Sequence, residues 1–168
     1  MAPRYDIPRA APEPLRQVQL FVNSVDLHNG VEWLPDWLDA RGLGGAVARA
    51  TELREALRLL LRANNGDPID PTALELVNSA AVRVRPELDR EGRLRFATDG
   101  DGLDEIVAIV LGATRDGSWR RLKACPTCCW SFYDGSPNRS ATWCSMQLCG
   151  NRKKTRAYRS RHRGRAAS

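Results

Sequence analysis

Five cysteines, all placed between Cys125 and Cys149, constrain this 168-residue chain more than any other feature. Two residues separate Cys125 from Cys128, 15 residues follow, and four residues then separate Cys144 from Cys149. The clustering and the odd number fit a local metal site better than a disulfide framework. Two thiolate pairs on separate tight turns can converge into the tetrahedron that structural zinc prefers. The spacing therefore predicts a Zn2+ site with Cys125, Cys128, Cys144 and Cys149 as ligands, and buried cysteines without metal are the simpler alternative.

Two further residues compete for places in this ligand set. Cys129 neighbours Cys128 and could replace it, but Cys128 keeps the two-residue knuckle spacing. With Cys128 as ligand, the alternation of Trp130 and Phe132 sends both rings to one side of a strand that packs the site. His162 lies 13 positions past Cys149, where a surface role is favoured.

Four thiolates leave no coordination position open for water, so we expect the metal to hold the fold rather than to hydrolyse a substrate. Zinc contributes ~10–16 kcal/mol in finger peptides, more than a core of about 25 residues can supply. Residues 120–150 are therefore predicted to be unfolded without metal.

The charge of the chain is divided unequally. Residues 1–120 carry 15 Arg and 19 acidic residues, a net charge of −4, whereas residues 121–168 carry 11 Lys or Arg and one acidic residue, Asp134, a net charge of +10. Such asymmetry points to a nucleic acid or an anionic surface as the partner of the basic part. A merely solvated tail is the alternative.

The basic segment follows directly on the last cysteine. We expect Gly150 to turn the backbone out of the knuckle and Asn151 to cap a new helix. Along that helix four arginines recur at spacings of four, three and four positions, and they form one guanidinium stripe. Guanidinium groups bind phosphate bidentately, so the segment predicts contact with double-stranded DNA, with base and phosphate contacts left open. The expected DNA-binding residues here are Arg152, Lys153, Lys154, Arg156, Arg159, Arg161 and Arg163.

Hydrophobic periodicity predicts a mostly helical α+β fold in front of the zinc module. Proline-rich residues 1–14 are expected to form a flexible arm, residues 15–120 one domain, and residues 121–168 the zinc module with its basic C-terminal helix. Helices are expected over residues 15–25, 35–41, 46–63, 71–81 and 103–113, and a β-hairpin over 82–85 and 94–96. The 46–63 helix is expected to turn its polar face, with Arg49, Glu52, Arg54, Glu55, Arg58 and Arg62, to solvent. In the 71–81 helix, Leu74, Val77 and Ala81 are expected to face the core.

Catalysis and membrane insertion have little support in the sequence. His28 and His162 are the only histidines, and no phosphate-cradling glycine loop or catalytic dyad is visible, so we do not expect an enzyme. No stretch approaches the ~20 consecutive apolar residues that a membrane span requires. We expect a cytoplasmic protein.

Four segments resemble the CGNR zinc-finger family, over about 40 residues. They are Trp130-Ser131-Phe132-Tyr133-Asp134, Asn138-Arg139-Ser140, Trp143-Cys144-Ser145-Met146 and Cys149-Gly150-Asn151-Arg152. The resemblance implies Zn2+ bound by Cys125, Cys128, Cys144 and Cys149, with Cys129 where a non-ligand residue, often glycine, stands. Arg139, inside a matching segment, is added to the expected DNA-binding residues.

The preceding part of the chain is similar to the ABATE domain, a family associated with stress-induced transcription regulation in bacteria. Phe21-Val22-Asn23-Ser24-Val25-Asp26 and Leu53-Arg54-Glu55-Ala56-Leu57-Arg58 carry that similarity. Asn23 and Asp26 are candidates for lining a ligand pocket, and a capping or core hydrogen-bonding role is the favoured alternative.

Together these features predict a bacterial DNA-binding transcription regulator, with a sensory or assembly domain in front and a zinc module as reader. An alternative is a protein-interaction module that docks on an acidic partner such as an RNA polymerase component. RNA binding is a third hypothesis, based on Tyr158 and Trp143, and packing of these two rings is the favoured alternative. A homodimer is compatible with each of these, and the sequence leaves the oligomeric state open.

Overall fold

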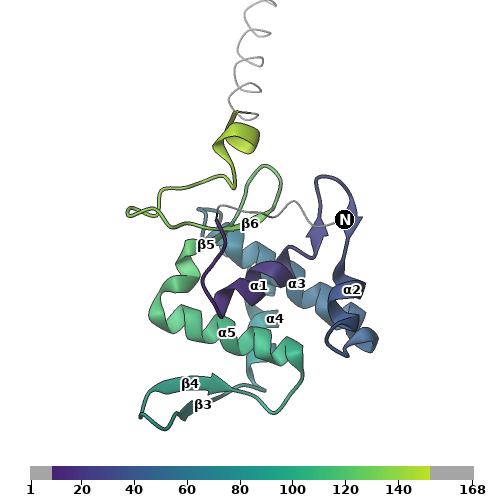
Figure 1. Ribbon diagram of the computed structural model, residues 1–168, viewed down its shortest axis with the longest axis vertical. Helices are drawn as coiled ribbons and strands as arrows, with labels where there is room; N and C mark the ends of the chain where they lie inside the picture. Colours follow the sequence, from purple (N-terminus) through teal and green to yellow (C-terminus); the bar gives the residue numbers. More distant parts are fainter. Residues whose placement is uncertain (1–8, 152–168) are drawn as a thin grey trace, which may run out of the picture.

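The computed structural model describes residues 9–151, which form a mostly helical α+β fold as the sequence predicts (Figure 1). The helices are α1 (Leu15–Val22), α2 (Leu34–Asp39), α3 (Val47–Ala63), α4 (Pro71–Ala81) and α5 (Gly102–Asp116). Short 3-10 helices cover Gly44–Ala46 and Ser118–Arg121, and a π-helical turn, η3, covers Met146–Gly150. Three antiparallel strand pairs complete the fold: β1 (Val25–Asp26) with β2 (Val31–Glu32), β3 (Arg85–Leu88) with β4 (Leu94–Ala97), and β5 (Leu122–Ala124) with β6 (Ser131–Tyr133). Within residues 9–151, none of the helices is both long and apolar enough to cross a membrane.

The main core lies where α1, α3, α4 and α5 pack together. Its largest fully buried side chains include Phe21, Leu57, Leu61 and Leu103. The same cluster continues past α5 into β5, with Leu122 and Ala124 among its buried residues, and a second cluster surrounds the cysteines. The first strand of the zinc module, β5, is therefore packed into the helical core. The β3–β4 hairpin lies at the opposite end of the molecule (Figure 1).

Several element ends follow from the turn residues recognised in the sequence. Asp70 caps α4 by accepting a hydrogen bond from the Ala73 backbone N–H at 2.8 Å, ahead of proline at the first helical position. Gly42 lies in the left-handed conformation at φ +68°, three residues after α2 ends. The Asp70 cap confirms the predicted start of α4, whereas α2 ends at Asp39, two residues before the predicted Arg41.

Other elements differ from the expectation. The first helix ends at Val22 rather than Val25 because the Asn23 side chain binds the zinc module and the chain then forms β1. The β3–β4 hairpin begins three residues later than predicted. In α4, Val77 is buried and Ala81 packs against the core as predicted, but Leu74 is 41% exposed and Ala73 is buried in its place.

Residues 9–14 of the predicted flexible arm pack on the body of the protein. Ala11 is buried in the main core, and the Arg9 carbonyl accepts a hydrogen bond from the Tyr133 backbone N–H at 2.9 Å. The Arg9 guanidinium donates to the Trp143 carbonyl at 2.8 Å and lies 5.6 Å from the centre of the Phe132 ring. The proline content did not predict this contact, because its partners lie more than 100 residues away in the sequence. Residues 1–8 lie outside the described residues.

Candidate metal centre

A tight turn between β5 and β6 carries the first cysteine pair. The Cys125 N–H donates to the Trp130 carbonyl at 2.9 Å, and the Cys129 N–H donates to the Cys125 carbonyl at 2.9 Å. Cys129 has φ +60°, a left-handed conformation that non-glycine residues rarely adopt. The chain therefore reverses at Cys129, directly after Cys128, and the strand that follows begins at Ser131.

A helical turn carries the second pair. The Ser145 hydroxyl oxygen accepts from the Leu148 N–H at 3.2 Å, and the Ser145 carbonyl accepts from the Cys149 N–H at 2.9 Å. Ser145 is thus the N-cap of η3, which brings Cys149 back toward Cys144 within a single turn.

This cap corrects the expectation for Gly150 and Asn151. Gly150 belongs to the helical turn and Asn151 has helical backbone angles, so the helical segment begins at Met146, six residues earlier than predicted. A Cβ on Gly150 would lie 2.6 Å from the Met146 sulfur. Gly150 therefore continues the helical turn beside Met146 and does not change the direction of the chain.

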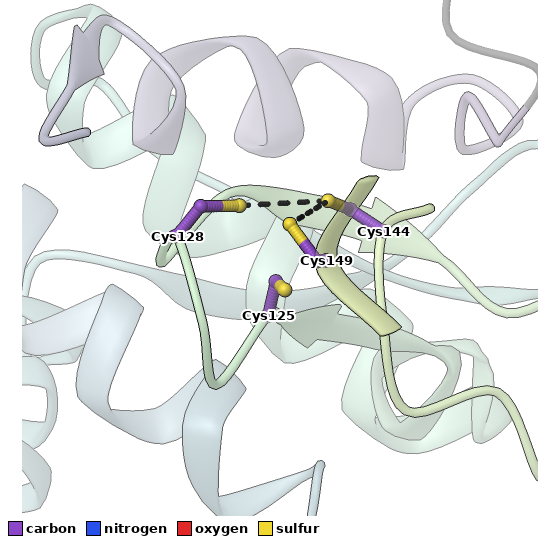
Figure 2. Close-up of side chains that lie close together, drawn as sticks. All are labelled: Cys125, Cys128, Cys144 and Cys149. Atoms are coloured by element: carbon purple, nitrogen blue, oxygen red, sulfur yellow. Dashed lines mark hydrogen bonds between the residues drawn. The ribbon is translucent and has the colours of Figure 1, made fainter. Parts of the chain in front are cut away.

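Four sulfur atoms converge between these two turns (Figure 2). The ligand atoms of Cys125, Cys128, Cys144 and Cys149 all lie within 4.8 Å of one another. The sulfur of Cys144 is 3.5 Å from that of Cys128 and 3.7 Å from that of Cys149. A tetrahedral zinc ion with Zn–S bonds of about 2.3 Å sets its sulfur atoms about 3.8 Å apart. The donor set and its spacing therefore fit Zn2+, and Cys129 is not part of the group.

The acidity of the thiols also favours a bound cation. Hydrogen bonds from Cys128 and then Cys144 lower the pKa of Cys125 well below its ordinary value of 9.0. The hydrogen bond to Cys125 raises the pKa of Cys128 above 9.0, and it raises the pKa of Cys144 to about 12. One thiolate thus opposes the ionisation of its neighbours, and a divalent cation supplies the positive charge that lets all four ionise.

Aromatic rings pack around the sulfur atoms as the alternation predicts. Trp130 and Phe132 are buried in one cluster with Cys125, Cys128 and Cys149. Trp143 lies partly buried against the same cluster.

A buried ion pair orders the loop between the two cysteine pairs. The Lys123 ammonium group donates to Asp134 at 2.8 Å and to the carbonyls of Arg139 and Ala141 at 2.6 and 3.0 Å. Asp134 also accepts from the Ala141 N–H at 2.9 Å. Burial of the Asp134 carboxyl group acts to raise its pKa, but hydrogen bonds from Lys123 and Ser136 outweigh it and lower the pKa to about 2. Lys123 and Asp134 therefore hold both ends of the loop that carries Arg139.

Side-chain amides of the helical domain bind the backbone of the zinc module. The Asn23 amide accepts from the Ser131 N–H at 2.8 Å and donates to the Ser131 carbonyl at 2.9 Å. Gln19 donates to the same carbonyl at 3.2 Å. Asn65 donates to the carbonyls of Ala124 and Thr142, at 2.9 and 2.8 Å. These two carbonyls lie one and two residues before Cys125 and Cys144, so Asn65 connects the two halves of the module.

Two arginines of α3 are buried instead of exposed, contrary to the expectation for its polar face. Arg54 donates to Ser24 at 3.2 Å and to Glu32 at 2.6 Å. Arg58 donates to the Cys129 carbonyl at 2.9 Å and to the Val22 carbonyl at 2.6 Å. Helical periodicity places both residues opposite the apolar stripe of α3, but the β1–β2 pair lies over Arg54 and the zinc module lies over Arg58. The sequence did contain one indication that these arginines differ from ordinary surface residues, because both lie in the segment that resembles the ABATE domain.

The remaining predicted site residues are the two ligand-binding candidates, Asn23 and Asp26, and the candidates for DNA binding. Asn23 and Asp26 have hydrogen-bonding roles within the fold, because Asp26 accepts from the backbone N–H groups of His28 and Asn29, each at 3.0 Å. That is the alternative weighed above, and ligand binding by either residue stays a prediction. Arg139 is exposed, with φ +50°. The predicted positions Arg152, Lys153, Lys154, Arg156, Arg159, Arg161 and Arg163, like Tyr158 and His162, lie outside the described residues.

A mostly helical domain joined to four converging thiols defines a zinc-binding protein with a C-terminal finger module. The family described as "Putative stress-induced transcription regulator", ABATE, matches residues 16–117, and the CGNR zinc finger matches residues 121–162. The first match covers more than half of the sequence, so the chain belongs to the ABATE family and carries a CGNR zinc finger. Both resemblances stated from the sequence are confirmed. No curated protein matches the chain.

Proposed function

We propose that this protein is a DNA-binding transcription regulator whose zinc module fixes the start of an arginine-rich segment on duplex DNA. Cys125, Cys128, Cys144 and Cys149 are the proposed ligands of a structural Zn2+. The single observation that carries the proposal is the position of η3. It holds the fourth thiol at Cys149 and leads, within three residues, into the segment that begins at Arg152.

Charge supports a polyanion as the partner. Residues 121–168 carry 11 Lys or Arg against one acidic residue, Asp134, and that residue is buried and paired with Lys123. A segment with this excess of positive charge attracts phosphate at long range. DNA is the polyanion that the match to a transcription-regulator family favours.

Arg139 supports the same interface from a second part of the module. Its carbonyl is bound by the Lys123 ammonium group at 2.6 Å, which holds the backbone while the residue remains exposed. A side chain presented by an ordered loop loses less entropy on binding than one on a flexible loop.

Titration of a labelled duplex at several salt concentrations tests the proposal. If about five phosphates are neutralised, the logarithm of the binding constant should fall with the logarithm of salt concentration with a slope near −4.5. Cys144→Ser should abolish the zinc-dependent part of binding. A flat salt response, or full affinity in metal-free Cys144→Ser protein, contradicts the proposal.

A second candidate is docking of the finger on an acidic protein partner, such as a component of the transcription machinery. Exposed apolar side chains on η3 favour it, because Met146 is 43% and Leu148 is 49% exposed. Substitution of Leu148 by Ser distinguishes the two candidates. Unchanged duplex affinity together with loss of a captured acidic protein would support protein docking, whereas loss of duplex affinity would place Leu148 at the DNA interface.

A further inference from the structure

Arg58 belongs to α3 of the helical domain, but it donates hydrogen bonds to the zinc module and to the end of α1 as well as to Glu55 on its own helix. Its Nη1 donates to the Cys129 carbonyl at 2.9 Å, its Nη2 to the Val22 carbonyl at 2.6 Å, and its Nε to Glu55 at 2.9 Å. The residue is 4% exposed, so water cannot replace these partners. Leaving two buried carbonyls unpaired is costly, which fixes the guanidinium in this position.

Arg58 acts on the metal site through the backbone of the knuckle. Its positive charge is paired with Glu55 at 2.9 Å, so its contribution to the site is the hydrogen bond to the Cys129 carbonyl. Arg58 contacts the residue directly after Cys128, and its guanidinium stays charged at any working pH. Its bond to the Cys129 carbonyl also holds the left-handed turn at φ +60° that directs Cys128 toward the other sulfur atoms.

An independent contact links the same knuckle to α1. Asn23, the residue after α1, pairs with both backbone groups of Ser131 at 2.8 and 2.9 Å. Arg58 holds α1 at the Val22 carbonyl, one residue earlier. The end of α1, the buried guanidinium on α3 and the zinc knuckle therefore form one hydrogen-bonded unit.

We propose that Arg58 is a positioning residue for the zinc knuckle, through which zinc binding is thermodynamically linked to the packing of α1 on α3. Linkage is reciprocal. Zinc that orders the knuckle tightens the α1–α3 contact, and any ligand that shifts α1 relative to α3 changes the affinity for zinc. The inference rests on zinc binding and is independent of DNA binding.

Substitutions of Arg58 in the full-length protein test the first half of the linkage. Zinc affinity is measured by competition with a chromophoric chelator under reducing conditions. Arg58→Met should weaken zinc binding about 10–100-fold, the usual effect of removing a group that supports metal ligands. Arg58→Lys should recover part of the loss, because it keeps the charge but not the planar fork that reaches two carbonyls.

Arg62→Met is the matched control. Arg62 lies one turn further along α3 and pairs with Asp67 at 2.7 Å, away from the knuckle. Its loss should change zinc affinity by no more than about twofold, as for an exposed ion pair. Equal zinc affinities for Arg58→Met and Arg62→Met would overturn the proposal.

Amide hydrogen exchange with and without zinc tests the second half. Zinc should increase the protection of α1 and α3 in the wild type, and this increase should largely disappear in Arg58→Met. If zinc leaves the protection of α1 and α3 unchanged in the wild type, the proposal is wrong. Should Arg58→Met fail to fold, Asn23→Ala replaces it, since this change removes the paired bonds to Ser131; unchanged zinc affinity in that variant would equally overturn the linkage.

Discussion

Cys129 shows how a single residue can be chemically suited to a metal site and still be excluded from it by the backbone. Its left-handed conformation at φ +60° turns the chain, and the four sulfur atoms that converge are those of the other cysteines. The turn, rather than the thiol, is what this position contributes. The two-residue spacing to Cys125 identified Cys128 correctly, whereas the positive φ at the next residue had no signal in the sequence beyond the family's frequent glycine.

Cys129→Gly should therefore retain one zinc per chain. Glycine relieves a left-handed conformation that costs about 1–2 kcal/mol, and it adds about 0.5–1 kcal/mol of chain entropy to the unfolded state, so we expect a small net gain in the free energy of unfolding. Metal analysis and urea unfolding measure both quantities. Cys128→Ser is the control and should lower the zinc content. Loss of zinc from Cys129→Gly would mean that Cys129 is a ligand.

Asn65 is a second residue whose role depends on contacts distant in sequence. The sequence predicted only that Asn64, Asn65 and Gly66 end a helix, which they do. The amide of Asn65 in addition donates to carbonyls near both cysteine pairs. Such contacts cannot be predicted from local spacing, because their partners lie 59 and 77 residues further along the chain.

Asn65→Asp should lower the free energy of unfolding by about 2–4 kcal/mol. The substitution keeps the shape but removes both N–H donors, and each unsatisfied buried carbonyl costs about 1–3 kcal/mol. Denaturant unfolding of the zinc-loaded protein measures the loss. Asn78→Asp, at an exposed position on α4, introduces the same charge and should have little effect.

At the scale of elements, the loop between β6 and η3 is held by a buried ion pair. Lys123 and Asp134 bind each other, and between them they bind backbone groups of Arg139 and Ala141. The alternating pattern of the short strands could indicate a module packed around a metal. It could not indicate that Lys123, a residue of the basic region, would be buried. Among residues 121–151, Lys123 is therefore a cation that the charge count includes but that does not face solvent.

Asp134→Asn should destabilise the zinc module by about 3–5 kcal/mol, because removing one partner leaves the Lys123 ammonium group buried without its counter-ion. Chemical denaturation monitored by tryptophan fluorescence detects the change. Asp99→Asn, which breaks the exposed pair with Arg85, is the control and should have no measurable effect. A similar loss of stability in both variants would contradict the special role of the buried pair.

The Asp101 carboxylate, at the start of α5, makes a pH-dependent contribution to the free energy of unfolding. Burial acts to raise the pKa of Asp101, but hydrogen bonds from Arg49 and from the backbone N–H groups of Asp104 and Leu103 lower it below its ordinary value of 3.8. The stabilisation is therefore complete above pH of about 4 and is lost as the pH falls through the lower pKa of the folded protein. The difference in urea midpoint between wild type and Asp101→Ala should accordingly shrink on acidification through this range. A difference independent of pH would show that the carboxylate charge plays no part.

For the whole molecule, the sequence predicted a helical domain followed by a zinc module and located the four thiols. It did not predict how firmly the two parts are joined. That junction consists of side chains from α1 and α3, such as Asn23 and Arg58, bound to backbone groups of the module. Polar residues on a helix surface look solvent-exposed to any analysis of periodicity, and only the tertiary arrangement shows that a second unit covers them.

The contact of Arg9 with Trp143 spans 134 positions of the chain and has a consequence for biosynthesis. During translation, the segment around Arg9 is made long before Phe132 and Trp143, the residues that it contacts in the folded protein. The cysteines themselves are translated after every helix of the N-terminal domain. Capture of zinc by the four thiols is therefore expected to follow the synthesis of α1 to α5 and to take place on helices that have already been made.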